Sequence, residues 1–180
     1  MPSFLVPFLL MVSALGYSQT TIWRENFNSY ANGTENGTGT GFASQLWTTT
    51  ITGKVWVQGG RLEATNLGAE GIWQTNAINV FGFESVSFNM DVATQADTSQ
   101  FEQGSLYFIE EYRIDGAATW TQFENASGDS SPADILQSNC TVNLPSTEST
   151  LMMRIRFYNT SNYEYYFIDN VAVEGRLPYC

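Results

Sequence analysis

The sequence predicts an all-β protein, an antiparallel two-sheet β-sandwich with about ten to twelve strands. Short runs in which apolar and polar residues alternate are separated by turn residues, and no segment has the 3.6-residue period of an amphipathic helix. The composition agrees, because the twelve Phe, nine Tyr and five Trp fit the pleated surface of a sheet. A chain of 180 residues suits one domain with its own core, and no internal repeat is present.

The chain begins with an apolar run, residues 2–15, that is too short to span a bilayer. We predict a secretory signal peptide over residues 1–19, a β-sandwich domain over 20–175 and a tail or truncation remnant at 176–180. The first basic residue is Arg24, so the basic segment typical of signal peptides is missing. Two alternatives to a signal peptide therefore stay open, namely a buried N-terminal strand and a misassigned start codon. The prediction places the mature chain outside the cell or on its surface, without a membrane span.

The strands expected in the first half are separated by recognisable turns. Residues 28–41 are too poor in apolar side chains to fold alone and are predicted as a long loop. Gly59-Gly60 is predicted as a two-residue hairpin turn. The expected strands cover residues 21–27, 47–52, 54–58, 61–66, 71–75 and 86–92.

In the second half, Asp115-Gly116 is predicted as the turn of another hairpin. Polar segments at 94–104 and 127–133 are expected to be loops. The expected strands cover residues 105–114, 119–124, 135–144, 151–158 and 164–175.

The closing strand contains a carboxylate among apolar residues. Asp169 shares the parity of Phe167, Val171 and Val173, so a regular strand would point it into the core. An unpaired buried carboxylate costs several kcal/mol. Asp169 therefore requires a cation, strong hydrogen-bond donors, or a bulge that turns it outward.

Several motifs over residues 22–175 carry a family resemblance. They are Glu25-Asn-Phe27 in the first strand, residues 71–80 and 86–92 in central strands, the hairpin of 106–120, residues 151–159, and Ile168-Asp-Asn-Val-Ala-Val173 in the last strand. In order and spacing they resemble the concanavalin A-like jelly-roll domains of secreted bacterial surface proteins, of lectin, glucanase or carbohydrate-binding-module type. The resemblance implies a carbohydrate-binding or adhesion domain.

The same resemblance implies a structural Ca²⁺ between the first and last strands. Glu25 and Asp169 match the family's ligand positions, and Asn26 and Asn170 are supplementary oxygen donors, the type of ligand that hard cations prefer. In the alternative, Asp169 accepts backbone N–H bonds at a bulge and Glu25 is solvated.

Two strands carry polar and aromatic residues on the parity opposite to their apolar residues. Such a face suits polysaccharide, because sugar C–H faces stack on rings while charged groups bind hydroxyls. The alternative is a solvated face with salt bridges such as Glu111–Arg154. Trp56, Trp73 and Trp120 are further candidates, although a Trp in a strand more often belongs to the core. The predicted ligand residues are Tyr107, Glu111, Arg113, Arg154, Arg156 and Tyr158.

Composition excludes several function classes. The chain has no histidine, which rules out Ser-His-Asp catalysis and His-containing zinc sites. Its net charge of −11 argues against nucleic acid. A glucanase needs paired acids on one face, but Glu110 and Glu111 are expected on opposite faces and Asp115 in a turn. Cys140 and Cys180 permit one disulfide, and free thiols are an equal alternative.

The function that these observations favour is a non-catalytic, secreted carbohydrate-binding or adhesion module with a structural calcium. A structural spacer of a longer surface protein is the alternative from a different class. A glycoside hydrolase or lyase of jelly-roll type is less favoured, because the carboxylate spacing fails.

Overall fold

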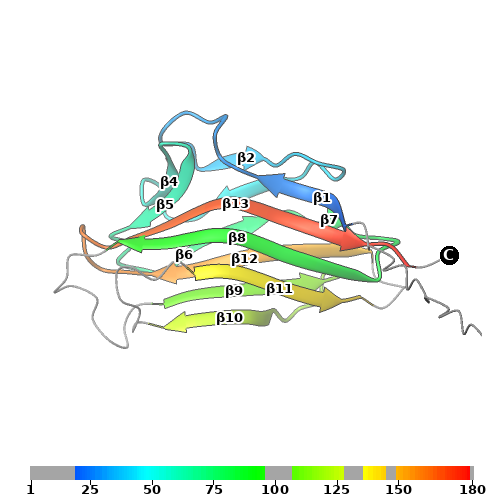
Figure 1. The fold of residues 1–180 in the computed structure, drawn as a ribbon. Coiled ribbons are helices and arrows are strands. Elements are labelled where there is room, and N and C mark those ends of the chain that lie inside the picture. The colour runs from blue at the N-terminus through cyan, green and yellow to red at the C-terminus, as the bar shows by residue number, and fades with distance from the viewer. Residues whose placement is uncertain (1–18, 96–106, 128–135, 145–148, 179–180) are drawn as a thin grey trace, which may run out of the picture.

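The structure is a computed structural model that describes residues 19–95, 107–127, 136–144 and 149–178. Every regular element in these residues is a β-strand, and all pairings are antiparallel. The strands form two sheets that lie against each other with their strands running in similar directions (Figure 1). The predicted all-β, two-sheet sandwich is confirmed.

Sheet A has six strands and sheet B has seven. In spatial order sheet A contains β11 (Leu136–Asn143), β8 (Ser85–Gln95), β13 (Tyr165–Arg176), β5 (Arg61–Thr65) and β4 (Val55–Gln58), and β1 (Gln19–Glu25) pairs with β13. Sheet B contains β10 (Thr121–Ser127), β9 (Tyr107–Ile114), β12 (Thr150–Tyr158), β6 (Gly71–Thr75), β3 (Leu46–Thr49) and β2 (Asn36–Thr38), and β7 (Ile78–Asn79) pairs with β12.

The described residues contain thirteen strands, which exceeds the expected ten to twelve. The strand β2 lies inside the predicted loop 28–41, and β7 was not expected. Main-chain hydrogen bonds hold β2 against β3 and do not need apolar side chains, so the alternation pattern does not detect this Asn-Gly-Thr strand.

Both predicted hairpin turns are confirmed. Gly59 and Gly60 have φ angles of 60° and 81°, and Asp115 and Gly116 have φ angles of 47° and 69°. Positive φ at both central residues is type I′ geometry, and at Gly59-Gly60 it joins β4 directly to β5. At Asp115-Gly116 four further residues precede β10. Asp115 Oδ1 also accepts the Thr150 N–H at 2.7 Å, which fixes this turn against the start of β12.

The core fills the space between the sheets. Along β12 the apolar residues are buried and the intervening residues are half-buried, as the alternation predicted. Trp23, Trp47 and Trp73 are fully buried, so Trp73 belongs to the core and not to a binding face. The buried residues of β12 are Leu151, Met153, Ile155 and Phe157.

A bulge in β13 corrects the parity predicted for its first half. The register with β8 shifts between Asp169 and Ala172, and Asn170 has a φ of 50°. Residues 165–168 pair with β5, whereas residues 171–176 pair with β1 along the same edge. Tyr166 and Ile168 therefore belong to the core cluster, while Phe167 lies outside that cluster beneath the Arg61 guanidinium. The bulge adds one residue to the alternation of β13, so even-numbered residues face the core before it and odd-numbered residues face the core after it.

Some predictions concern residues outside the described part. Most of the predicted signal peptide, the predicted loops at 94–104 and 127–133 apart from their first residues, the side chain of Cys140 and all of Cys180 lie there. A search of the described residues finds no helix with the length and hydropathy needed to cross a membrane.

Candidate functional site

The outer face of β9 and β12 brings together the six residues predicted to bind a ligand. Tyr107, Glu111 and Arg113 come from β9, and Arg154, Arg156 and Tyr158 come from β12. Within this pair of strands Arg154 lies opposite Glu111, and Tyr158 lies opposite Tyr107. Directly opposed residues share one face of an antiparallel sheet, so these side chains form a single surface, here called the β9–β12 face.

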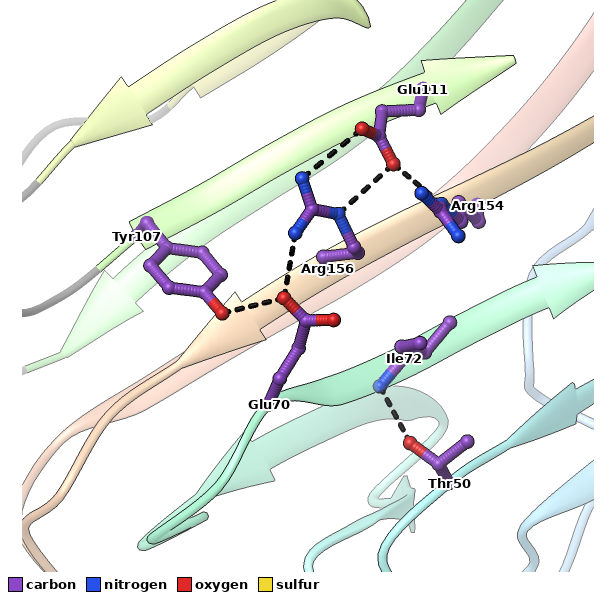
Figure 2. Close-up of polar contacts among 7 residues, drawn as sticks. All are labelled: Thr50, Glu70, Ile72, Tyr107, Glu111, Arg154 and Arg156. Atoms are coloured by element: carbon purple, nitrogen blue, oxygen red, sulfur yellow. Dashed lines mark hydrogen bonds and ion pairs between the residues drawn. The ribbon is translucent and has the colours of Figure 1, made fainter. Parts of the chain in front are cut away.

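Glu111 joins the two arginines of β12 (Figure 2). Its Oε2 accepts from Arg156 Nε at 3.0 Å and from Arg154 Nε, and its Oε1 accepts from Arg156 Nη2 at 3.1 Å. The Arg156 contact is bidentate, the geometry in which guanidinium and carboxylate bind most strongly. The Glu111–Arg154 salt bridge expected from the sequence is present.

Glu70 completes the network, and no pattern in the sequence indicated it. Its Oε2 accepts from Arg156 Nη1 at 2.7 Å and from the Tyr107 hydroxyl at 2.6 Å. Glu70 precedes β6, and Ile72 is anchored beside it because its N–H donates to Thr50 Oγ1 at 2.8 Å (Figure 2). A polar residue just before a strand looks like any loop residue in the sequence, and only the pairing of β6 with β12 brings it here.

The network fixes the charge states of its members. Burial alone raises the pKa of Glu111, but the hydrogen bonds from Arg156 and Arg154 outweigh burial, and its pKa lies below the ordinary value. The pKa of Glu70 is lowered in the same way by Tyr107 and Arg156. Burial and the hydrogen bond to Glu70 raise the pKa of Tyr107 to about 12. At neutral pH both carboxylates are therefore charged, and Tyr107 keeps its proton.

Aromatic rings lie at both ends of the β9–β12 face. The Tyr107 and Tyr158 rings stack with centroids 5.8 Å apart. At the other end the Trp120 ring lies 4.8 Å from the Arg113 guanidinium carbon and 4.2 Å from that of Arg154. Of the three tryptophans considered from the sequence, Trp120 belongs to this face, whereas Trp73 is buried and Trp56 lies on β4 in sheet A.

The predicted calcium ligand Glu25 is occupied by protein donors. It is 5% exposed. Its Oε1 accepts the Phe27 N–H at 2.8 Å, and its Oε2 accepts from the Tyr30 hydroxyl at 2.8 Å and from Trp47 Nε1 at 2.6 Å. Three donors satisfy a buried carboxylate without a cation. The alternative that Glu25 is solvated is wrong, because this carboxylate instead links β1 to the core Trp47.

Asp169 lies on the opposite side of sheet A. It is paired with Asp91, which is exposed, whereas Glu25 is paired with the buried Val171. The bulge turns Asp169 outward, and its Oδ1 accepts the Asn170 N–H at 2.7 Å, as the bulge alternative predicted. Burial raises the pKa of Asp169, and the nearby Asp91 carboxylate raises it further.

The four predicted calcium ligands therefore do not fit one shared ion. Asn26 Oδ1 accepts the Asn28 N–H at 3.3 Å, and Asn170 Nδ2 donates to Asp91 Oδ2 at 2.7 Å. Within the described residues no group of three or more Asp, Glu, Cys or His side chains is arranged to hold a metal ion. Calcium binding stays a prediction that the arrangement of Glu25 and Asp169 does not support.

The carboxylates of β9 are arranged as the sequence predicted. Glu111 faces outward to the arginines, whereas Glu110 has the opposite parity and is 1% exposed. Asp115 lies in the turn after β9. Retaining and inverting glycosidases need two carboxyl groups that flank one bond, and these three do not share a face.

Comparisons with known proteins give matches among solved structures only. No family model matches the sequence, and no curated protein matches it. The chain is similar to a family 29 carbohydrate-binding module, with 15% identity, 89% of this chain and 90% of that chain covered, and a TM-score of 0.48. A xylan-binding domain from family 22 has 12% identity, 89% and 97% coverage, and a TM-score of 0.46. The cleaved adhesin domain of Lys-gingipain has 18% identity, 87% and 99% coverage, and a TM-score of 0.43. Carbohydrate-binding modules are the class that the sequence motifs resemble, but similarity at this level transfers no ligand and no residue role.

Proposed function

We propose that this chain is a non-catalytic carbohydrate-binding module that binds polysaccharide along the β9–β12 face. The observation that carries the proposal is a row of aromatic and hydrogen-bonding side chains on the outer face of one sheet. Tyr107 and Arg113 are six residues apart on β9, which corresponds to ~20 Å at the rise of a strand. A face of this length suits an extended polymer better than a single small molecule.

The chemistry of the face matches that of a sugar chain. Pyranose rings present apolar C–H faces, which stack on Tyr and Trp, and hydroxyl groups, which bind carboxylates and guanidinium groups. Both kinds of group alternate here within one surface. Because ion pairs already hold Glu111, Arg154 and Arg156 in place, binding loses less side-chain entropy than it would on a disordered surface.

The proposed function also includes a place of action and a role in adhesion. We expect the module to act outside the cell, as the predicted signal peptide implies. Adhesion through a surface glycan is compatible with the same face. A structural calcium is a separate prediction, and polysaccharide binding at the β9–β12 face does not depend on it.

Truncation of Tyr158 tests the proposal. We expect Tyr158→Ala to weaken polysaccharide binding about tenfold, because removal of an aromatic anchor typically costs more than about 1 kcal/mol. Affinity electrophoresis through gels that contain soluble plant and bacterial polysaccharides measures the change. Phe81→Ala is the matched control, since Phe81 is an exposed aromatic residue outside the β9–β12 face and its loss should leave retardation unchanged. A wild-type chain that no polysaccharide retards would contradict the proposal and favour a structural spacer.

A further inference from the structure

The β9–β12 face carries surplus positive charge on an acidic chain. The sequence contains 7 basic and 18 acidic residues, for a net charge of −11. Three of the seven basic residues, Arg113, Arg154 and Arg156, lie on this face. The network described above contains two carboxylates, Glu70 and Glu111. Among the side chains of this face that the structure describes, three positive and two negative charges leave one positive charge, whereas the chain as a whole is strongly negative.

The three arginines differ in how many of their guanidinium nitrogens donate hydrogen bonds to a carboxylate. Arg156 donates through Nε, Nη1 and Nη2 to Glu111 and Glu70. Arg154 donates to Glu111 through Nε alone. Arg113 donates through Nε and Nη2 to the Met152 sulfur, at 3.3 Å and 3.0 Å, and within the described part of the chain no carboxylate pairs with it. A thioether is a weak acceptor, so Arg113 is a cation with only weak compensation.

The Trp120 ring contacts both of the less occupied guanidinium groups. Their carbons lie 4.8 Å and 4.2 Å from the centroid of the same ring. Cation–π contacts stabilise each group, but two cations beside one ring also repel each other. An anion that contacts both groups would offset this repulsion and accept N–H donors that Glu111 and Met152 leave free. Guanidinium groups bind carboxylate and tetrahedral oxyanions in two-point fashion, which fits this arrangement.

We propose that Arg113 and Arg154, held over Trp120, bind an acidic group of the polysaccharide, either a uronate carboxylate or a sulfate ester. The ligand class is therefore an acidic polysaccharide. This inference rests on the proposed function and adds the charge of the ligand to it. The net charge of −11 does not prevent this binding, because physiological salt screens exposed charges that lie more than about 8 Å away.

The test compares three soluble polymers, a neutral glucomannan, a polyuronate and a sulfated galactan. Isothermal titration calorimetry of the wild-type chain should give tighter binding to one of the acidic polymers than to glucomannan, and added salt should weaken it. The preferred acidic polymer distinguishes carboxylate from sulfate. Arg113→Gln should weaken acidic binding at least about tenfold, because it removes a charge-assisted hydrogen bond to the anion.

Arg24→Gln is the matched control, because it removes the same charge from an exposed side chain of β1 in sheet A and should leave binding unchanged. A melting curve shows that each variant is folded. Binding to glucomannan alone, or equal acidic affinity in Arg113→Gln and wild type, overturns this inference and leaves the proposed function standing. Binding to none of the three polymers counts against both.

Discussion

Glu111 organises the β9–β12 face at the scale of single residues. It is 7% exposed and accepts from two arginines of the neighbouring strand. Each arginine alone would be a long, mobile side chain, and the shared carboxylate fixes both in one geometry. The face can therefore present guanidinium and aromatic groups in a defined order before any ligand arrives.

Glu111→Gln tests this role through stability and its pH dependence. The folded-state pKa of Glu111 is lowered, so the unfolded chain binds the proton more readily. The carboxylate therefore makes its full contribution to the free energy of unfolding at pH values above the ordinary Glu pKa. This contribution is lost as the pH falls through the pKa of Glu111 in the folded state. We expect the variant to lose about 1–3 kcal/mol near neutral pH and to lose less in acid. Urea unfolding over a pH series measures both.

A matched control for this variant is Glu174→Gln. Glu174 is a half-buried residue of β13, and among the described residues its carboxylate accepts one long hydrogen bond, from Asn89 Nδ2 at 3.4 Å. Its substitution should change the free energy of unfolding by much less. Equal losses in the two variants, or a Glu111→Gln loss that persists unchanged into acid, would mean that the ion pairs of Glu111 contribute nothing specific.

At the scale of elements, the bulge in β13 was only partly predicted from the sequence. The sequence required that Asp169 be paired or turned outward, and the structure turns it outward. Parity counting assumes a continuous strand, so it assigned Phe167 to the core with Val171 and Val173. The change of neighbour from β5 to β1 lies in the pairing of distant segments, which the local pattern does not encode.

Asn170 is the residue on which the bulge depends. Its φ of 50° lies in the left-handed region, which Asn and Gly adopt readily and β-branched residues adopt only at a cost. We expect Asn170→Val to cost about 1–3 kcal/mol of stability. Asn170→Gly is the control, because it also loses the bond to Asp91 but keeps the backbone conformation. Thermal and urea denaturation of both variants measure the difference. Similar stability in the two would show that left-handed strain at this position is not what holds the bulge.

At the scale of the whole molecule, alternation and turn chemistry were sufficient to predict the class of fold. They also placed three residues on the outward parity of each of two strands, because β9 and β12 each keep a regular period of two. Alternation does not show which strands are neighbours in a sheet. The partnership of β9 with β12, and of β12 with β6, joins segments far apart in the chain, and therefore Glu70 could not be predicted. The calcium prediction correctly made the first and last strands neighbours in sheet A, but Glu25 and Asp169 do not lie on one face of that sheet.

The most direct test of polysaccharide binding on the β9–β12 face is chemical-shift mapping by nuclear magnetic resonance, for which a chain of 20.0 kDa is suitable. The labelled protein is titrated separately with glucomannan and polyuronate oligosaccharides. We predict concentration-dependent shifts along β9 and β12, centred on Tyr107, Glu111 and Arg156, and little change on the outer face of sheet A. Shifts confined to the hollow beside Arg61 and Asp169 in sheet A, or none with either oligosaccharide, would contradict the account.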